Sequence, residues 1–289
     1  MAAPSKGGAS ASSINMVGGD DLSSMVLITG GAFRMGCDRR EGHPSDREGP
    51  SRLVEVAPFL IDAMVVSNGR FARFVEATGY ITDAERAGWS FVFAGLLPDD
   101  FEPTRGVASA PWWREVPGAS WRHPEGLQSR ISTRGELPVV HVSHDDALAF
   151  CKWAGKRLPR EAEWEKAARG SLAGARFPWG DDETPAGKHR CNVWQGTFPS
   201  DNTLDDGFYG LAPVDAFPQN DFGLHSIVGN CWQWCADWFD DEATHRAIRG
   251  GSYLCHPSYC WRYRNAARSA STPDSTTGNV GFRCVADPS

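Results

Sequence analysis

Two cysteines five positions apart, Cys255 and Cys260, are the side chains of this sequence best suited to chemistry. At that spacing a regular helix places two side chains about 140° apart around its axis, and a regular strand places them on opposite faces. Pro257 lacks an N–H group and keeps His256 out of the helical region, so we expect the chain to turn between the cysteines. A turn that brings the two sulfurs together would form a disulfide, a thiolate-bound metal site or a redox site.

The residues around the pair favour some metals over others. Two thiolates without a third strong ligand suit a soft ion of low coordination number, and Cu(I) is the first candidate. Zn²⁺ normally takes four ligands, whereas only His256 adjoins the pair and no further Cys or His lies in the segment. From the spacing alone, an ordinary disulfide or two buried free thiols remain open.

Composition limits the classes of protein that this chain can be. Its 289 residues suffice for one large domain or two smaller ones. The net charge of −7 and the absence of a dense Lys/Arg block argue against a nucleic-acid partner. No run approaches the roughly 18 apolar residues of a membrane span. The 12 Trp, 31 Gly and 19 Pro favour a compact, loop-rich fold packed on aromatic rings over an all-helical one.

The beginning of the chain differs in composition from the rest. Residues 1–22 are rich in Ala, Ser and Gly, and they lack the charged and apolar regions of a secretory signal. We therefore predict a disordered leader over 1–22, a single catalytic domain over 23–289, and a soluble protein of the cytoplasm. Eight cysteines are too few for a disulfide scaffold of this size, so we expect buried free thiols at Cys37, Cys191, Cys231 and Cys235.

Local patterns predict the elements that must position the cysteine pair. Strands are predicted over 25–29, 32–35, 51–61, 247–250 and 281–285. Three helices are predicted. The first covers 69–77, is capped by Ser67 or Asn68 and ends at Gly79. The second runs from the Ser143–Asp146 capping box to Trp153, and the third covers 160–169, with Pro159 at its first turn and Gly170 at its end. The stretch from Gly79 to Arg134 is polar and interrupted by Pro, and its length suggests a functional role.

Taken together, several segments resemble the formylglycine-generating enzyme family. The matching segments are 25–26, 30–36, 138–143, 155–165, 192–196 and 250–252. The segments typical of the catalytically competent branch are C-H-P-S-Y-C-W-R-Y-R at 255–264, then 271–274 and 278–284. The resemblance extends from about residue 25 to the C-terminus.

This resemblance implies both a fold and an activity. The fold is mixed α+β, a single-domain variant of the C-type-lectin-like class with little regular secondary structure. The activity is that of a copper-dependent oxidase, which converts the cysteine of a C-x-P-x-R segment in an unfolded or nascent sulfatase into formylglycine. The reaction uses O₂ and a thiol reductant. In this view Cys255 and Cys260 hold Cu(I), and the substrate thiolate joins as a third ligand.

The resemblance also assigns further site residues. Ser252 supplies a hydroxyl beside the copper pair, Trp232 an aromatic wall, and Asn279 part of the same pocket. Ala84, Trp89 and Trp112 fall where the family contacts the peptide, and a Trp ring offers a large contact area at low entropy cost. Without the resemblance, Ser252 is an ordinary turn hydroxyl and Asn279 a capping residue. Trp232, Trp89 and Trp112 are then core aromatic side chains.

Calcium is the second metal that the resemblance implies. The side chains of Asn192 and Asp206, with the carbonyls of Val193 and Phe208, match one family calcium site, and hard oxygen ligands suit Ca²⁺. The second family site falls on Ser226, Gly229, Cys231 and Gln233. There Ser226 and Gln233 replace an Asn and a Glu, so we expect this site to be weak or empty and the chain to hold one calcium ion.

The sequence departs from the family pattern at several places. His144 stands where the family has Trp, Cys231 replaces a small apolar residue, and the segment 238–250 is short. One family disulfide is lost because Ala168 and Asn265 replace its cysteines, whereas Cys151 and Cys284 match a second.

Two other functions stay open: the same copper and O₂ chemistry on a different peptide or protein, and a non-catalytic binding protein on this fold. An iron-dependent sulfoxide synthase is disfavoured because the chain has no room for the extra helical domain.

Overall fold

The computed structural model describes residues 24–39 and 41–288, so the predicted leader lies outside the described residues. The helices are α1 (Asn68–Thr78), α2 (Asp83–Ala87), α3 (His144–Ala154) and α4 (Glu161–Arg169), with 3₁₀ turns η1 (Pro44–Asp46), η2 (Ala94–Leu96) and η3 (Pro185–Gly187). The longer strands are β1 (Met25–Ile28), β2 (Gly31–Met35), β3 (Arg52–Val56), β4 (Phe59–Asp62), β5 (Trp89–Phe93), β7 (Ala110–Pro117), β10 (Trp232–Trp238), β11 (Arg246–Arg249) and β12 (Arg268–Ser271). The two-residue strands are β6 (Gly106–Val107), β8 (Gly196–Thr197), β9 (Asp201–Asn202), β13 (Val280–Gly281) and β14 (Val285–Ala286).

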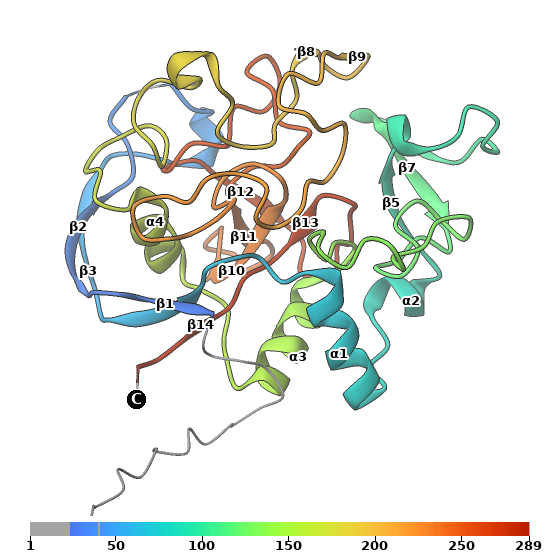
Figure 1. Cartoon of the computed structure of the whole chain (residues 1–289), viewed down its shortest axis with the longest axis horizontal. Helices are drawn as coiled ribbons and strands as arrows, with labels where there is room; N and C mark the ends of the chain where they lie inside the picture. The colour runs from blue at the N-terminus through green and yellow to red at the C-terminus, as the bar shows by residue number, and fades with distance from the viewer. Residues whose placement is uncertain (1–23, 40, 289) are drawn as a thin grey trace, which may run out of the picture.

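Several small sheets, rather than one large sheet, organise the molecule. The central sheet has the strand order β12-β11-β10-β13, and β10 pairs in parallel with β13 but antiparallel with β11. A second sheet, β1-β4-β14, joins the beginning of the described chain to its end. The β2–β3 hairpin and the β5-β7-β6 sheet lie on opposite sides of the central sheet (Figure 1). This arrangement confirms the mixed α+β domain with little regular secondary structure.

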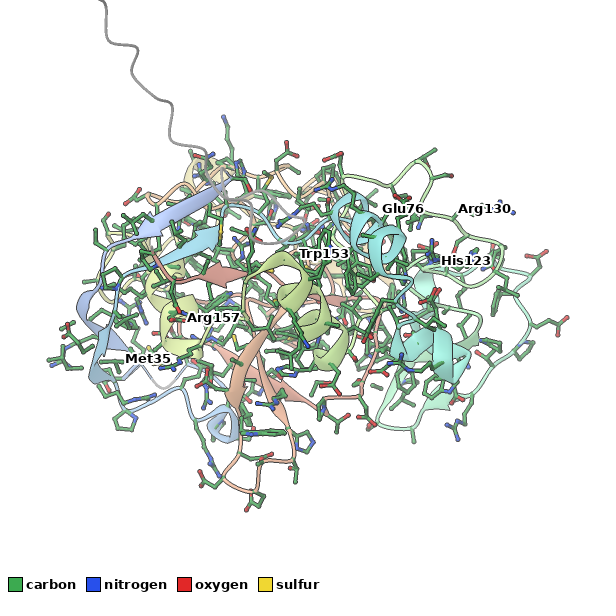
Figure 2. All side chains as sticks on the ribbon, turned by 90° about the horizontal axis from the view of Figure 1, so that it is seen from below. Met35, Glu76, His123, Arg130, Trp153 and Arg157 are labelled. Carbon is green, nitrogen blue, oxygen red and sulfur yellow. The ribbon has the colours of Figure 1, made fainter. Side chains whose placement is uncertain are left out.

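The main hydrophobic core fills the space between the helices and the central sheet. Phe71 of α1, Phe150 of α3 and Phe282 pack ring against ring within it. In the view with all side chains, Met35 of β2 and Arg130 lie toward opposite ends, and Trp153 of α3 lies between them (Figure 2). The same core includes both Cys255 and Cys260, so the cysteine pair is part of the packed interior and is not carried on a surface loop.

The three predicted helices are confirmed, and their boundaries lie within one residue of the prediction because they depend on local capping. Ser67 accepts a hydrogen bond from the N–H of Arg70 at the start of α1, and Gly79 ends the helix with φ 67°. At α3 both hydrogen bonds of the capping box between Ser143 and Asp146 are present. Helix α4 begins at Glu161, one residue later than predicted.

The stretch from Gly79 to Arg134 is more ordered than its polar sequence suggests. It contains the short helix α2 and the sheet β5-β7-β6, whose long strand β7 begins beside Pro111 and ends at Pro117. Proline is tolerated at strand ends, where a missing N–H removes no necessary hydrogen bond. The predicted strand over 281–285 is instead two short strands, β13 and β14, which belong to different sheets.

The structure changes the expected state of two sets of cysteines. The sulfurs of Cys151 and Cys284 lie 3.6 Å apart, far beyond the roughly 2.05 Å of a disulfide, and both are buried free thiols. The disulfide implied by the resemblance is therefore not formed in this structure. Cys37 is only half-buried, contrary to the expectation, whereas Cys191, Cys231 and Cys235 are buried free thiols.

Among the described residues, no helix has both the length and the apolarity required to cross a bilayer.

Two buried histidines make the stability of the fold sensitive to acid. Burial lowers the pKa of His141 to about 4, and burial together with nearby Arg246 lowers the pKa of His144 to about 4. His144 takes the place of a family Trp: its ring packs edge-on against Trp234, and its Nε2 lies 3.2 Å from the carbonyl of Cys235. Both side chains are therefore neutral in the folded protein at neutral pH.

We expect the free energy of unfolding to fall as the pH drops from about 6.5 to about 4. In that window the unfolded chain binds protons at both histidines while the folded chain does not, which costs roughly 3 kcal/mol per histidine. Urea unfolding of the wild type and of His144→Phe as a function of pH measures this effect. The variant should lose about half of the dependence, and an unchanged pH profile would contradict the assignment to His144.

Candidate functional site

The turn predicted at Pro257 brings the two cysteines together. After β11 ends, Gly250 and Gly251 adopt φ 96° and 74°, and a Cβ atom on Gly251 would meet the Tyr263 backbone at 3.1 Å. The turn then closes through a hydrogen bond of 2.7 Å from the N–H of Cys260 to the carbonyl of His256. As a result the sulfurs of Cys255 and Cys260 lie 2.7 Å apart.

The cysteine pair is a pair of free sulfurs in hydrogen-bond contact. The separation exceeds that of a disulfide, and both cysteines are free. Burial raises the pKa of Cys255. The hydrogen bond from Cys255, followed by the nearby guanidinium of Arg262, lowers the pKa of Cys260. The charge distribution therefore favours a thiol at Cys255 that donates to a thiolate at Cys260.

Asp46 holds the arginine that faces the pair. The guanidinium of Arg262 lies 3.9 Å from the sulfur of Cys260, and it donates to the Asp46 carboxylate at 2.5 and 3.1 Å. Asp46 belongs to the 3₁₀ turn η1, far away in sequence, so this ion pair joins the first hairpin region to the cysteine segment. A positive charge is thereby fixed beside the two sulfurs.

A chain of hydrogen bonds fixes the other side of the pair. The N–H of Ser252 donates to the sulfur of Cys255 at 3.4 Å, and the side-chain amide of Asn279 donates to the Ser252 hydroxyl at 3.0 Å. Thr277 in turn donates to Asn279 at 2.8 Å. The N–H of Trp232 donates to the carbonyl of Asn279 at 2.8 Å, which aligns the start of β10 with the same segment.

These residues surround an open pocket of about 190 Å³. The two sulfurs lie in its wall together with aromatic, aliphatic and hydroxyl side chains. The lining residues are Trp112, Trp113, Trp232, Ile248, Ser252, Leu254, Cys255, Tyr259, Cys260, Arg262, Ser269, Ala270, Ser271, Thr277, Asn279 and Val280. A pocket of this size accommodates one or two side chains of a ligand, not a whole cofactor.

An aromatic cluster supports one wall of the pocket. The ring of Tyr259 is 39% exposed, stacks on Phe198 at 4.7 Å and meets Trp112 edge-on at the same distance. Phe198 lies in the turn between β8 and β9, and its ring also packs against Trp194. The turn therefore braces an exposed aromatic surface that is suited to an extended peptide.

The structure brings six of the predicted site residues together and leaves two elsewhere. Those around the pocket are Cys255, Cys260, Ser252, Trp232, Trp112 and Asn279. Ala84 is buried within α2 at 1% exposure, and Trp89 at the start of β5 packs edge-on against Phe91, so neither lines the pocket. The peptide contacts assigned to Ala84 and Trp89 stay predictions.

Sequence reasoning did not single out Tyr259, Arg262 or Thr277, which also line the pocket. Tyr259 and Arg262 lie within or next to the cysteine segment, so their proximity in sequence was an available signal. Thr277 was not recognisable, because the Asn279 side chain that it supports contacts Ser252 only in the folded chain.

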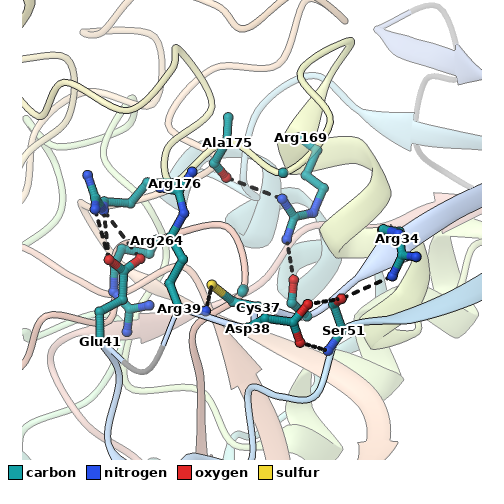
Figure 3. A pocket seen from close by; sticks show the side chains of 13 residues that line it. Arg34, Cys37, Asp38, Arg39, Glu41, Ser51, Arg169, Ala175, Arg176 and Arg264 are labelled. Carbon is teal, nitrogen blue, oxygen red and sulfur yellow. Dashed lines mark hydrogen bonds and ion pairs between the residues drawn. The ribbon is translucent and has the colours of Figure 1, made fainter.

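A second cavity of about 230 Å³ lies beside Cys37 (Figure 3). Several arginines line it, but each arginine has its own partner: Arg39 pairs with Asp181, Arg176 with Glu41, Arg169 with Glu165, Arg264 with Glu48, and Arg34 with the hydroxyl of Ser51. The N–H of Arg39 donates to the Cys37 sulfur at 3.3 Å. Because carboxylates already pair with four of the five guanidinium groups, this cavity does not form an anion site.

Three of the four residues of the first predicted calcium site, Asp206, Val193 and Phe208, contact one another, whereas the Asn192 amide donates to Gly210 and Asn230. Both oxygens of the Asp206 carboxylate accept backbone N–H groups, from Val193 at 3.0 Å and from Phe208 at 3.0 Å. Burial raises the pKa of Asp206, and no ion pair with a Lys or Arg offsets its charge in the described part of the chain. The side-chain amide of Gln195 is pressed against the Val193 carbonyl. A half-buried carboxylate without a Lys or Arg partner, next to a backbone carbonyl, fits a hard cation.

No group of three or more His, Cys, Asp or Glu side chains gathers as a metal site among the residues that the structure describes. The cysteine pair therefore offers a ligand set of two sulfurs. That set fits a soft, low-coordinate ion such as Cu(I) and does not fit tetrahedral zinc. A pair of adjacent free cysteines, buried at the side of an open aromatic pocket, defines a thiol-centred enzyme site on a mixed α+β domain.

The sequence matches the family described as the sulfatase-modifying factor enzyme 1-like domain over residues 13–288. It is 54% identical to the formylglycine-generating enzyme of Thermomonospora curvata, over 91% of this chain and 93% of that protein. It is also 46% identical to the inactive Cα-formylglycine-generating enzyme 2 of Bos taurus, over 93% and 90%. Among solved structures, PvdO from Pseudomonas aeruginosa aligns with a TM-score of 0.63 and 26% identity, over 91% of this chain and 94% of that chain.

The chain therefore belongs to the formylglycine-generating enzyme family. Because the family includes an inactive relative of similar identity, overall similarity alone does not decide whether a member is active. The chemistry must be argued from the residues of the pocket.

Proposed function

We propose that this chain is a copper-dependent formylglycine-generating oxidase. It converts the cysteine of a C-x-P-x-R segment in an unfolded or nascent sulfatase into formylglycine, with O₂ as oxidant and a thiol as reductant. The observation that carries the proposal is the pair of sulfurs of Cys255 and Cys260, 2.7 Å apart in the wall of an open pocket.

The overall reaction balances without another reagent. A cysteine side chain, O₂ and two thiols yield an aldehyde, hydrogen sulfide, a disulfide and water. The cysteine gives up two electrons and the two thiols give up two, and together these reduce O₂ to the level of water. Loss of a hydrogen from the substrate Cβ leads to a thioaldehyde, which water hydrolyses to the aldehyde.

The residues of the chain have separate roles in this proposal. Cys255 and Cys260 would hold Cu(I), which supplies a site for the substrate thiolate and for the activation of O₂. The Asn279–Ser252 hydrogen bond holds the Cys255 side of the pair, and Arg262, pinned by Asp46, favours negative charge on Cys260. Trp112 and Tyr259 offer the ring surface for the peptide, so that binding holds the reacting sulfur in place.

The test is mass spectrometry of a C-x-P-x-R peptide incubated with the copper-loaded protein, O₂ and a thiol reductant. Conversion of the thiol to an aldehyde is the expected result. If the protein binds Cu(I) but leaves this peptide unchanged, the sulfatase substrate is wrong and another thiol peptide must be sought. If the protein binds no Cu(I), the oxidase proposal is overturned.

Calcium at the Asp206 site is the second part of the proposal. We expect the melting temperature of the wild type to fall by roughly 5–10 °C when a chelator removes calcium, as for a ligand present at about a hundred times its dissociation constant. In Asp206→Asn the melting temperature should be lower and no longer depend on calcium. Wild-type melting curves that coincide with and without chelator would refute the calcium site.

A further inference from the structure

The side chain of Gln233 lies at the centre of the region where the family resemblance expects a second calcium ion. It is completely buried, on β10 next to Trp232 of the pocket. Its amide oxygen accepts hydrogen bonds from the indole of Trp164 at 2.9 Å and from the guanidinium of Arg283 at 2.7 Å. Its amide nitrogen donates to the carbonyls of Ser226 at 3.3 Å and Ile227 at 3.1 Å.

The orientation of this amide follows from its neighbours. Trp164 and Arg283 present N–H groups only, so the atom that faces them must be the oxygen. The nitrogen therefore faces the two backbone carbonyls, and all four contacts join donors to acceptors. A carboxylate at this position would direct one of its oxygens at the carbonyls of Ser226 and Ile227. Those oxygens would repel one another unless a cation lay between them.

Positive charge already surrounds the site. The guanidinium of Arg283 donates to the carbonyls of Asp62 at 3.0 Å, of His225 at 2.9 Å and of Ser226 at 3.3 Å. Arg190 lines the small cavity of about 20 Å³ that adjoins Ser226. The hydroxyl of Ser226, itself buried, has no hydrogen-bond partner, and a neutral hydroxyl binds calcium weakly. Without an anionic ligand, these residues do not fit a divalent cation.

We propose that the Gln233 amide, together with the Arg283 guanidinium, replaces a calcium ion in this chain. The N–H groups of these two side chains satisfy backbone carbonyls around the site, among them those of Ser226 and Ile227. The junction between α4, the segment 225–227 and the segment that carries Arg283 is then held without metal. Calcium dependence in this chain is consequently confined to Asp206. The inference concerns a site outside the catalytic pocket and does not depend on the copper chemistry.

The discriminating experiment compares Gln233→Glu with Gln233→Met in the full chain at pH 8, where a glutamate is ionised. Thermal melting is followed with excess chelator and with millimolar calcium. We expect Gln233→Glu to melt roughly 5–15 °C below the wild type in chelator, and to melt less than half as far below the wild type when both are measured in calcium. Gln233→Met should be destabilised equally in both conditions, because its side chain can hold neither the amide contacts nor an ion.

A count of bound ions gives a second, independent readout. The wild type should bind a single calcium ion at equilibrium, Gln233→Glu should bind one more, and Asp206→Asn should bind none. Tight calcium binding that persists in Asp206→Asn would overturn the proposal, as would a Gln233→Glu protein whose deficit in melting temperature relative to the wild type is the same with and without calcium. If Gln233→Glu does not fold, the number of calcium ions bound by Asp206→Asn still shows whether calcium binds outside the Asp206 site. Because that count is independent of peptide conversion, failure of the oxidase proposal would not affect the result.

Discussion

Replacing either Cys255 or Cys260 by Ser is expected to abolish peptide conversion, with a loss of at least about a thousandfold in turnover. Both sulfurs are nearly fully buried in the pocket wall, at 1% and 5% exposure, so no other side chain can take their place without repacking. One sulfur alone holds Cu(I) poorly, since a hydroxyl is a much weaker ligand for a soft ion than a thiolate. Tight Cu(I) binding should therefore be lost in both variants, together with activity.

The substitution is conservative for the fold. Serine has nearly the shape of cysteine and still forms hydrogen bonds, so the Ser252 and His256 contacts of the turn remain available. Two measurements separate a chemical from a structural effect: competition for Cu(I) against a coloured chelator, and thermal melting without copper. We expect the first to change by orders of magnitude and the second by only a few degrees.

Cys37→Ser serves as the matched control. Cys37 is also a free cysteine, but it is half-buried beside the second cavity, and its sulfur contacts the N–H of Arg39 (Figure 3). This variant should keep wild-type copper affinity and turnover. Retained activity in Cys255→Ser or in Cys260→Ser would eliminate the copper pair as the reacting centre, whatever the result for Cys37.

The sequence predicts the reacting centre better than its surroundings because the information is local. A proline between two cysteines determines a turn within six residues, and the same holds for the Ser143–Asp146 box at the start of α3. The pocket walls depend instead on contacts between distant segments. Arg262 is held by Asp46, and Tyr259 is stacked on Phe198 of a separate hairpin. Neither pairing has a signature in a single sequence.

The same distinction explains the strands that were not predicted. β10 reads W-Q-W-C-A-D-W, and its first four residues are all buried, so it lacks the alternation of a half-exposed strand. The burial of Gln233 within this strand is acceptable only because Trp164 and Arg283 complete its hydrogen bonds. The family resemblance located the residue, but only the structure reveals which groups it joins.

Buried ion pairs give the strongest stability prediction, because β11, which leads into the cysteine segment, ends on a fully buried arginine. The guanidinium of Arg249 donates to Glu161 at 3.1 Å, to Glu165 at 2.6 Å and to the carbonyl of Asn265 at 2.8 Å. Its partners have other cations: Arg268 donates to Glu161 at 2.5 Å, and Arg169 donates to Glu165 at 2.7 Å. Arg249 joins both Glu161 and Glu165 of α4 to the central sheet.

We expect Arg249→Met to lower the free energy of unfolding by about 3–5 kcal/mol, because the methionine fills much of the volume but removes three buried hydrogen bonds, two of them to carboxylates. Urea unfolding measures the loss. Arg39→Met is the control: its ion pair with Asp181 is exposed on both sides, at 42% and 55%, and should contribute less than about 1 kcal/mol. Equal losses of unfolding free energy in the two variants would contradict the role assigned to the buried ion pairs of Arg249. Because Gly250 directly follows Arg249, the variant should also weaken Cu(I) binding at temperatures where it remains folded, which would link the ion pairs of α4 to the geometry of the cysteine pair.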